Sequence, residues 1–259
     1  MKNHFLFAYT GNKREEVETI HDSIQHNLDN ITHIIEPFCG SSAFSFYISL
    51  LYPKRFIYVL NDFDNHLIEL YRLVQNEELF NSFLNDLRAI GPTLNKELYN
   101  SNKNTSFIWW FIHIFYYQMV SGLFPMTHST DKFIHKVDKL DKCPIINFLR
   151  NEKNILRNED GVNIYKEYST NPTSFIFLDP PYIVQENSQY SSSSMLIYKH
   201  LHEHDIKLEI STIVLVLEYN WVISILFPNE KDTYKKRYRG HKKKETDHLI
   251  INNKKNILI

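Results

Sequence analysis

Apolar positions in the first third of the chain follow two different periods. Residues 33–38 form a short apolar run that leads to Gly40, and small side chains then open a helical pattern over residues 44–51. Residues 55–60 are β-branched and aromatic, and apolar positions at helical spacing return over residues 67–74. This order predicts strand, helix, strand, helix, a unit that usually belongs to a doubly wound sheet.

The strand pattern vanishes between about residues 76 and 157, where helical periodicity replaces it. For the aromatic run over residues 109–117 we favour a helix core over a base-stacking platform, because its aromatic side chains surround the helix. Strand signals return at residues 175–178 and 213–217, with a helical stretch near residues 201–209 between them. The sheet therefore resumes after a helical insertion.

The last part of the chain closes the predicted fold. The basic segment 231–244 and the run 248–251 are expected to form edge strands, paired as an antiparallel hairpin. The predicted class is α/β, a doubly wound sheet with an inserted, mainly helical domain. We assign residues 1–75 and 158–259 to the sheet domain and residues 76–157 to the insertion.

Composition narrows the class further. The 259 residues are 43% hydrophobic and 23% charged, a globular composition that excludes disorder and low-complexity fibre. Two cysteines, Cys39 and Cys143, make neither a disulfide framework nor a zinc site, which indicates a reducing compartment. The first residues lack a secretory pattern and no apolar stretch is long enough to span a membrane, so we expect an intracellular protein without a membrane partner.

Charge is distributed unevenly. The formal net charge is −1, yet residues 231–244 carry eight basic side chains against Asp232 alone. The basic residues are Lys231, Lys235, Lys236, Arg237, Arg239, Lys242, Lys243 and Lys244. Such a cluster favours contact with a phosphate backbone, and the alternative is a solvated surface hairpin.

The sharpest chemical signal is the string Asp179-Pro180-Pro181-Tyr182, directly after a buried-strand pattern. Two prolines fix the backbone, so the Asp179 carboxylate and the Pro180 carbonyl can point at one spot beside the ring of Tyr182. Two acceptors beside an aromatic plane suit a flat base that bears an exocyclic amine. The alternative is a strand-end turn that the prolines stiffen.

A second candidate site follows the first two strands. Gly40 allows the backbone to approach a ligand, and Glu36 lies near the end of the preceding strand. Asp62, at the tip of the second strand, is where a carboxylate would bind a ribose diol. The alternatives are a simple strand-to-helix turn for the loop and a helix N-cap for Asp62.

With these motifs in place, the chain resembles DNA adenine-N6 methyltransferases of the Dam type, as found in phages. The resemblance covers nearly the whole chain and rests on residues 9–13, 37–40, Asp62, 179–182 and the late string 246–248, Thr-Asp-His. It implies a Rossmann-like methyltransferase sheet with an inserted target-recognition domain. It also implies methyl transfer from S-adenosylmethionine to an adenine flipped out of DNA.

The resemblance implies roles residue by residue. For catalysis they are Asp179, Pro180, Pro181 and Tyr182; for S-adenosylmethionine they are Tyr9, Lys13, Glu36, Phe38, Gly40, Asp62, Tyr165 and Asp179. For contact with the nucleic acid, the charge of the basic segment, and not the resemblance, indicates Arg237, Arg239, Lys242, Lys243 and Lys244. No metal is expected, since His200, His202 and His204 alternate along a helical stretch and so point to different faces.

Several positions depart from the family pattern. Ser41 and Ser42 stand where many members carry a second glycine, and the usual Asp-Phe of the third motif is represented by Ile164-Tyr165. The pattern that reads the target site is reduced to Gln118, Ser121, Gly122 and Leu123, followed by Phe124, Pro125 and Met126. The target sequence is therefore not transferable. RNA as the substrate, or a nucleic-acid-binding relative without catalysis, are the alternatives.

Overall fold

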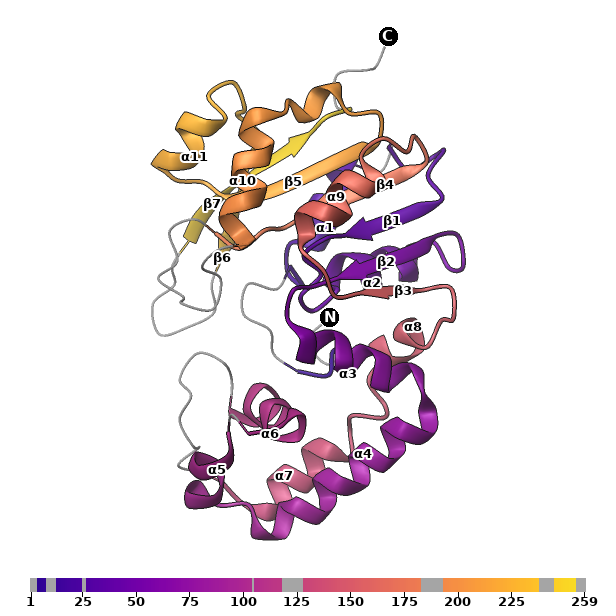
Figure 1. Cartoon of the computed structure of the whole chain (residues 1–259), viewed down its shortest axis with the longest axis vertical. Coiled ribbons are helices and arrows are strands. Elements are labelled where there is room, and N and C mark those ends of the chain that lie inside the picture. The colour runs from indigo at the N-terminus through magenta and orange to yellow at the C-terminus, as the bar shows by residue number, and fades with distance from the viewer. Residues whose placement is uncertain are drawn as a thin grey trace. The chain divides into compact units, whose positions relative to one another are not determined.

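The computed structural model describes residues 4–7, 13–24, 27–103, 105–117, 128–182, 193–237 and 245–254. The chain divides into two compact units (Figure 1). The helical unit comprises Met1–Arg14 and Asp64–Asn154, and the sheet unit comprises Glu15–Phe63 and Ile155–Ile259.

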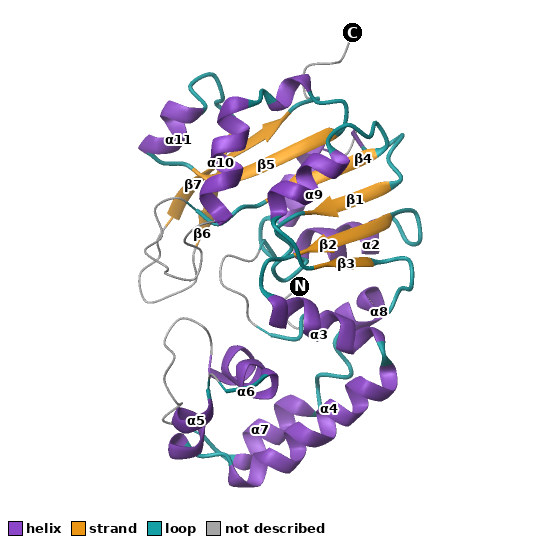
Figure 2. Cartoon of the chain, in the orientation of Figure 1, coloured by secondary structure: helices purple, strands orange, loops and turns teal. Residues whose placement is uncertain are grey.

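The sheet unit is built on one sheet of seven strands, in the order β3-β2-β1-β4-β5-β7-β6 (Figure 2). The strands are β1 His33–Glu36, β2 Ile57–Asn61, β3 Ile155–Arg157, β4 Ser174–Leu178, β5 Thr212–Glu218, β6 Thr233–Arg237 and β7 Glu245–Asn252. The first five in spatial order are parallel, whereas β7 runs antiparallel to both β5 and β6. The predicted α/β class and the predicted C-terminal hairpin are confirmed.

Strand β3 corrects the sequence analysis, which placed residues 155–157 in the helical insertion. It has three residues, pairs only with β2 among the described strands, and exposes 40% of Ile155. A strand this short and this exposed has no run of buried apolar positions, so its pattern is too weak to detect.

The two faces of the sheet are covered by different helices. On one face Phe44 of α2, Ala43–Leu51, stacks on Phe175 and Phe177 of β4 with ring centroids 5.7 and 4.1 Å apart. Helix α1, Val17–Ile24, lies beside α2, and His21 contacts Tyr47.

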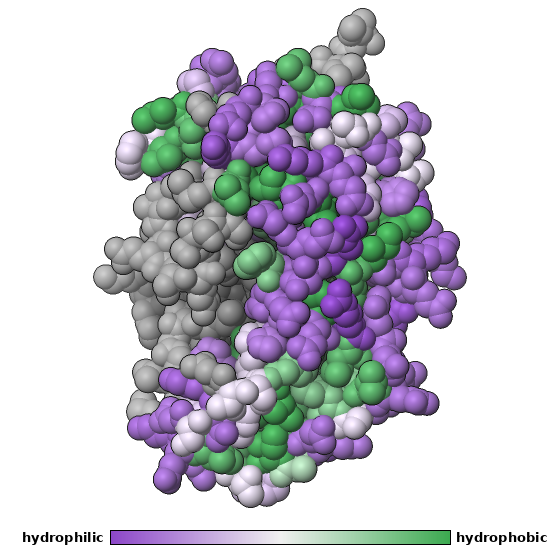
Figure 3. Space-filling view, in the orientation of Figure 1, coloured by the Kyte–Doolittle hydropathy of each residue, from purple (hydrophilic) through white to green (hydrophobic). Residues whose placement is uncertain are grey.

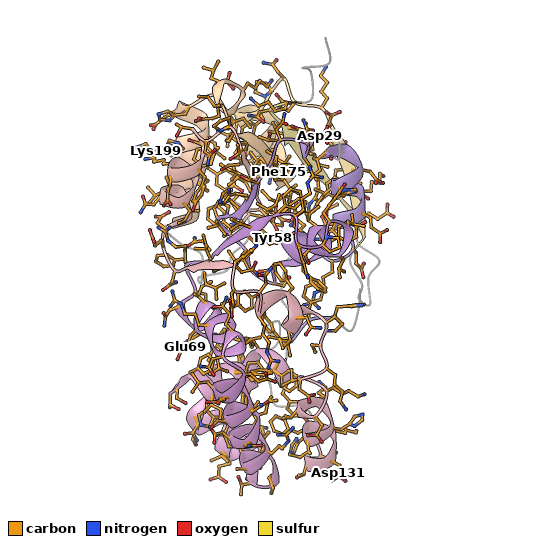
Figure 4. All side chains as sticks on the ribbon, turned by 90° about the vertical axis from the view of Figure 1, so that its right-hand side faces the viewer. Asp29, Tyr58, Glu69, Asp131, Phe175 and Lys199 are labelled. Atoms are coloured by element: carbon orange, nitrogen blue, oxygen red, sulfur yellow. The ribbon has the colours of Figure 1, made fainter. Side chains whose placement is uncertain are left out.

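The opposite face carries α9, Gly161–Tyr168, and α10, Ser193–Glu203, which lie in front of the sheet in Figure 1. Ile176 and Leu178, which alternate with the two phenylalanines along β4, pack there against Val162 and Ile197. Figure 4 shows the same layering from the side, with Phe175 between Lys199 of α10 and Asp29. Complete burial of each such side chain contributes about 1.5 to 3 kcal/mol.

The helical unit contains α3 Asn65–Gln75, α4 Glu77–Ile90, α5 Lys96–Asn102, α6 Phe107–Ile112, α7 Thr130–Val137 and α8 Ile145–Leu149, with a 3₁₀ turn Gly91–Thr93 and a π-helical turn His113–Tyr117. Phe111 is fully buried and contacts Phe83 and Phe115 at 5.1 Å each. The core interpretation of the aromatic run is thereby confirmed for Phe111. The unit also includes α3, which the sequence analysis assigned to the sheet domain.

The C-terminal part of the sheet unit has an apolar surface. The helix α11, Trp221–Leu226, exposes 72% of Trp221 and 66% of Ile225, and apolar residues gather there in Figure 3. None of the helices formed by the described residues is both long and apolar enough to cross a membrane.

Candidate active site

Three carboxylates follow the carboxyl ends of neighbouring parallel strands. Glu36 is the last residue of β1, Asp62 follows β2, and Asp179 follows β4. From β1 the chain proceeds to β2 and β3 on one side, and then crosses to β4 on the other side of β1. The carboxyl ends of β1 and β4 therefore flank the switch point of the sheet, where ligands of doubly wound folds bind.

Three hydrogen bonds, each with at least one backbone partner, tie the loop after β1 to the end of β2. The Cys39 N–H donates to the Asn61 carbonyl at 2.8 Å, and the Gly40 N–H donates to Asp62 Oδ2 at 2.9 Å. The Asn61 amide donates to the Pro37 carbonyl at 2.8 Å. Gly40 has φ 46°, the left-handed conformation that glycine adopts without a steric penalty. The loop therefore has one defined backbone path past Asp62.

Asp62 is not the N-cap of α3, so the helix-cap interpretation of this residue is wrong, while its contact with a ribose stays a prediction. The N-cap of α3 is Asp64, whose carboxylate accepts hydrogen bonds from the N–H groups of His66 and Leu67. Asp62 is half-buried and faces the Gly40 loop.

Ser42 adopts a conformation that serine rarely takes. Its φ is 52° and its ψ is 33°, in the left-handed region, immediately before α2. This is one of the two positions where the sequence carries serine instead of the family's second glycine. The backbone thus retains the shape that glycine favours at this point, while the serine side chain adds strain.

Burial is the main cause that raises the pKa of Glu36 to about 8, and the nearby charges of Asp179 and Asp62 add to this rise. Hydrogen bonding from Ser45, in the first turn of α2, opposes the shift, and the Ser45 N–H lies 2.8 Å from Glu36 Oε1. The three carboxyl groups therefore influence one another electrostatically. A cation placed near them would be stabilised by the charges of the two aspartates.

A third loop, after β3, joins this edge, and the sequence analysis missed it. The Asn158 amide donates to the Asp62 carbonyl at 2.8 Å, and the Glu159 N–H donates to Asn61 Oδ1 at 2.9 Å. Asp160 then caps α9 by accepting a hydrogen bond from the Val162 N–H at 2.9 Å. The string Asn158-Glu159-Asp160-Gly161 carries a detectable signal, an N-cap residue at the start of the helix α9.

Phe38 depends on Gly161. A Cβ atom at position 161 would lie 2.5 Å from two atoms of the Phe38 ring and 3.0 Å from the Pro37 carbonyl oxygen. Glycine at the start of α9 therefore allows this ring to lie against the helix, where Phe38 packs on the core.

Tyr165, in contrast, is not brought to this edge. It lies within α9, is fully buried, and its hydroxyl donates to Glu209 at 3.4 Å. Glu209 precedes β5, so this hydroxyl is directed toward the amino ends of the strands. The residue does not join the loops that carry Gly40 and Asp62.

The segment from Asp179 to Tyr182 is held from two sides. The hydroxyl of Tyr198, on α10, donates to the Pro181 carbonyl at 3.2 Å. The ring of Tyr182 contacts the ring of His248, on β7, with centroids 5.6 Å apart and planes at 86°. The segment is thus fixed between α10 and the antiparallel hairpin.

The remaining predicted site residues are placed only in part. Tyr9, Arg239 and Lys242–Lys244 lie outside the described residues, as do residues 118–127 and the Arg237 side chain. Lys13 is buried and belongs to the helical unit. Lys236, counted above within the basic segment, is instead buried, with its ammonium 2.7 Å from Glu16 Oε1. It therefore does not contribute to an exposed basic surface.

The described residues include no group of three histidine, cysteine, aspartate or glutamate side chains placed to hold a metal ion. His200, on α10, and His204, just after its end, stack with ring centroids 4.2 Å apart.

The mostly parallel sheet and the acidic edge at its switch point define a mixed α/β fold of the Rossmann-like methyltransferase type. Residues 9–107 match the family model of the D12 class N6 adenine-specific DNA methyltransferases. The matched residues include the loop after β1 and Asp62. Residues 179–182 lie outside the match. No curated protein matches the chain.

Proposed function

We propose that the protein transfers a methyl group from S-adenosylmethionine to the 6-amino group of an adenine flipped out of DNA. The observation that carries the proposal is the convergence of Glu36, Asp62 and Asp179 at the switch point, next to a left-handed glycine loop. The family match of residues 9–107 supports the class of reaction.

The residues at this edge fit the cofactor. S-adenosylmethionine supplies an activated methyl group on a positively charged sulfur. The acidic environment of Glu36 favours such a cation, and Gly40 leaves space for a ligand beside the backbone. Asp62 would accept hydrogen bonds from the ribose hydroxyls, and Phe38 would contribute an apolar wall. Tyr9 and Lys13 remain predicted cofactor contacts.

The target base would be held by the segment after β4. The Asp179 carboxylate and the Pro180 carbonyl would accept hydrogen bonds from the two N–H groups of the adenine amine, and Tyr182 would stack on the ring. S-adenosylmethionine would supply the methyl group to the amine nitrogen and leave as S-adenosylhomocysteine, and the Asp179 carboxylate would orient the amine and accept the proton that the nitrogen gives up. No covalent intermediate with the enzyme is needed. The protein would therefore accelerate the reaction by orienting the amine and by providing a matching electrostatic environment.

Purified protein incubated with S-adenosylmethionine and duplex DNA tests this proposal. After digestion to nucleosides, mass spectrometry should detect N6-methyladenine, and sequencing around it should give the recognition site. Parallel reactions with RNA and with single-stranded DNA separate the possible polymers. Methylation of RNA but not of DNA would show that RNA is the substrate. Cofactor binding by calorimetry without any methylation would favour the non-catalytic alternative.

A further inference from the structure

A buried polar cluster lies beside the proposed catalytic segment. We call Glu16, Tyr234, Lys236 and His248 the hairpin cluster, because three of them come from β6 and β7. Tyr234 and Lys236 are two positions apart, so they share one face of β6, and Tyr234 pairs across the hairpin with His248. Glu16 immediately precedes α1, which begins at Val17.

The Glu16 carboxylate is the centre of the cluster. It lies 2.7 Å from Lys236 Nζ, accepts a hydrogen bond from the Tyr234 hydroxyl, and lies 3.4 Å from His248 Nδ1. The exposed fractions are 4% for Glu16, 10% for the Lys236 side chain and 0% for His248. Four polar groups thus interact where the solvent is nearly excluded.

Such burial is costly unless each group has a defined partner. The following residues of β7, Leu249, Ile250 and Ile251, are the apolar side chains that a central strand normally buries. A histidine with no exposed surface departs from this pattern. Buried polar networks with well-matched partners hold their members in one arrangement, so the cluster fixes the orientation of the His248 imidazole.

The cluster contacts the segment after β4 through this imidazole. Tyr182 and His248 meet with perpendicular rings at 5.6 Å. The charges of Asp179 and Tyr182 add to burial and to Glu16 in raising the pKa of Tyr234, which places both residues in the electrostatic surroundings of the cluster.

We propose that His248 is a positioning residue, whose imidazole is oriented by Glu16 and Tyr234 and in turn fixes the ring plane of Tyr182 for stacking on the target base. The role rests on the proposed function, since Tyr182 is assigned there to the adenine. A perpendicular contact restricts rotation of the tyrosine ring, and a stacked base then presents its amine at a defined distance from the methyl donor. Small displacements of a reacting group cost large factors in rate.

The test compares His248→Ala with a matched control, His21→Ala. His21 is also a buried histidine of the sheet unit, 3.0 Å from a tyrosine hydroxyl, that of Tyr52, and it contacts the ring of Tyr47. Both variants lose an imidazole that bonds to tyrosine, but only one lies beside Tyr182. We expect His248→Ala to lower kcat at least tenfold while the Kd for S-adenosylmethionine stays within twofold, and His21→Ala to leave kcat unchanged.

A second variant controls for the possibility that His248→Ala does not fold. His248→Asn retains a polar group for Glu16 and Tyr234 but removes the ring, so it should fold and still show the lower kcat. Duplex DNA with 2-aminopurine at the methylated position reports stacking directly, because an aromatic neighbour quenches its fluorescence. We expect brighter bound 2-aminopurine for both His248 variants than for the wild type.

The outcomes separate the two proposals. If the wild-type chain methylates DNA and a folded His248→Asn variant keeps the wild-type kcat and fluorescence, the positioning role is wrong and the proposed function stands. Equal losses in the His248 and His21 variants would mean a general structural effect and would also overturn the role. A wild-type chain that methylates no nucleic acid removes the proposed function, and the role with it.

Discussion

The parallel and antiparallel parts of the sheet secure the candidate site in different ways. After β1, β2 and β3 the loops are joined by hydrogen bonds that each have a backbone partner, as in the bonds from Cys39 to Asn61 and from Gly40 to the Asp62 carboxylate. Beside β6 and β7 the same edge depends on contacts between side chains, with Glu16 and His248 behind Tyr182. A backbone group is present whatever the residue, so the loops require a particular side chain on one side of a bond at most, whereas the hairpin cluster requires particular residues on both sides.

Asp179 is where the two parts meet, since its charge raises the pKa of both Glu36 and Tyr234. Asp179→Ala should give the largest effect, a loss of methyl transfer of at least about a hundredfold, as for removal of a positioned polar group. The affinity for S-adenosylmethionine should change little, because the proposed partner is the target amine. Single-turnover rates and calorimetry measure the two quantities, and a variant with more than a tenth of the wild-type rate would contradict the assignment.

Glu36→Gln tests the electrostatics of the parallel part. The folded-state pKa of about 8 lies above the ordinary value of 4.5, so the folded protein retains a proton that the unfolded chain has lost. The retained proton stabilises the folded protein. This stabilisation is complete at pH values below the pKa of Glu36 in the unfolded chain, and it declines as the pH rises from about 4.5 to 8. Glutamine does not titrate, so the free energy of unfolding of the variant should not decline in this way. At pH 8 it should exceed that of the wild type by several kcal/mol, at about 1.4 kcal/mol per pKa unit.

Urea unfolding at pH 5, 6.5 and 8 measures the predicted divergence. The wild-type curve should fall relative to the variant over this interval. Parallel curves for the two proteins would show that Glu36 is ionised in the folded state.

Asp62→Ala should weaken binding of S-adenosylmethionine ten- to a hundredfold, since a hydrogen bond to a charged group contributes about 1.5 to 3 kcal/mol. Asp64→Ala is the matched control, because that carboxylate also accepts backbone N–H bonds but caps α3. The control should lose about 1 kcal/mol of stability and none of the affinity. Calorimetric affinity that is equal in both variants would place the ribose elsewhere.

The smallest effect concerns the backbone alone. Ser42→Gly should raise the free energy of unfolding by up to about 1 kcal/mol, because glycine adopts a φ of 52° without strain. Ser41→Gly, at a residue without positive φ, should lower it by about 0.5 to 1 kcal/mol through the added freedom of the unfolded chain. Urea unfolding of both variants measures the difference, and losses of equal size would contradict strain at Ser42.

The sequence predicted those parts of the fold in which the apolar positions follow one clear period. The strands β1, β2, β4 and β5 have buried apolar runs, and the hairpin follows from its position after them. Strand β3 could not be found, since Ile155 is exposed and only three residues pair. The bounds of the inserted domain and its role in target recognition stay predictions.

The places of Gly40, Asp62 and Asp179 after their strands could be predicted from motifs, and their roles stay predictions. Contacts between residues far apart along the chain could not be predicted. Lys236 looked like part of a phosphate-binding patch because charge in a sequence says nothing about a carboxylate such as Glu16, far away along the chain. Tyr165 was chosen for its place in a drifted motif, yet helix α9 turns its hydroxyl toward Glu209.

The bond between Tyr234 and Glu16 spans 218 positions of the sequence. During synthesis the ribosome has therefore produced β1, β2, β3, β4 and β5 before the partners of Glu16 exist. Contacts of such long sequence separation also form slowly, because a large loop must close first. A nascent chain can shape the Gly40 loop early, but the support behind Tyr182 comes only after β6 and β7 have been synthesised, so the protein acquires its proposed activity later than it acquires the rest of its sheet.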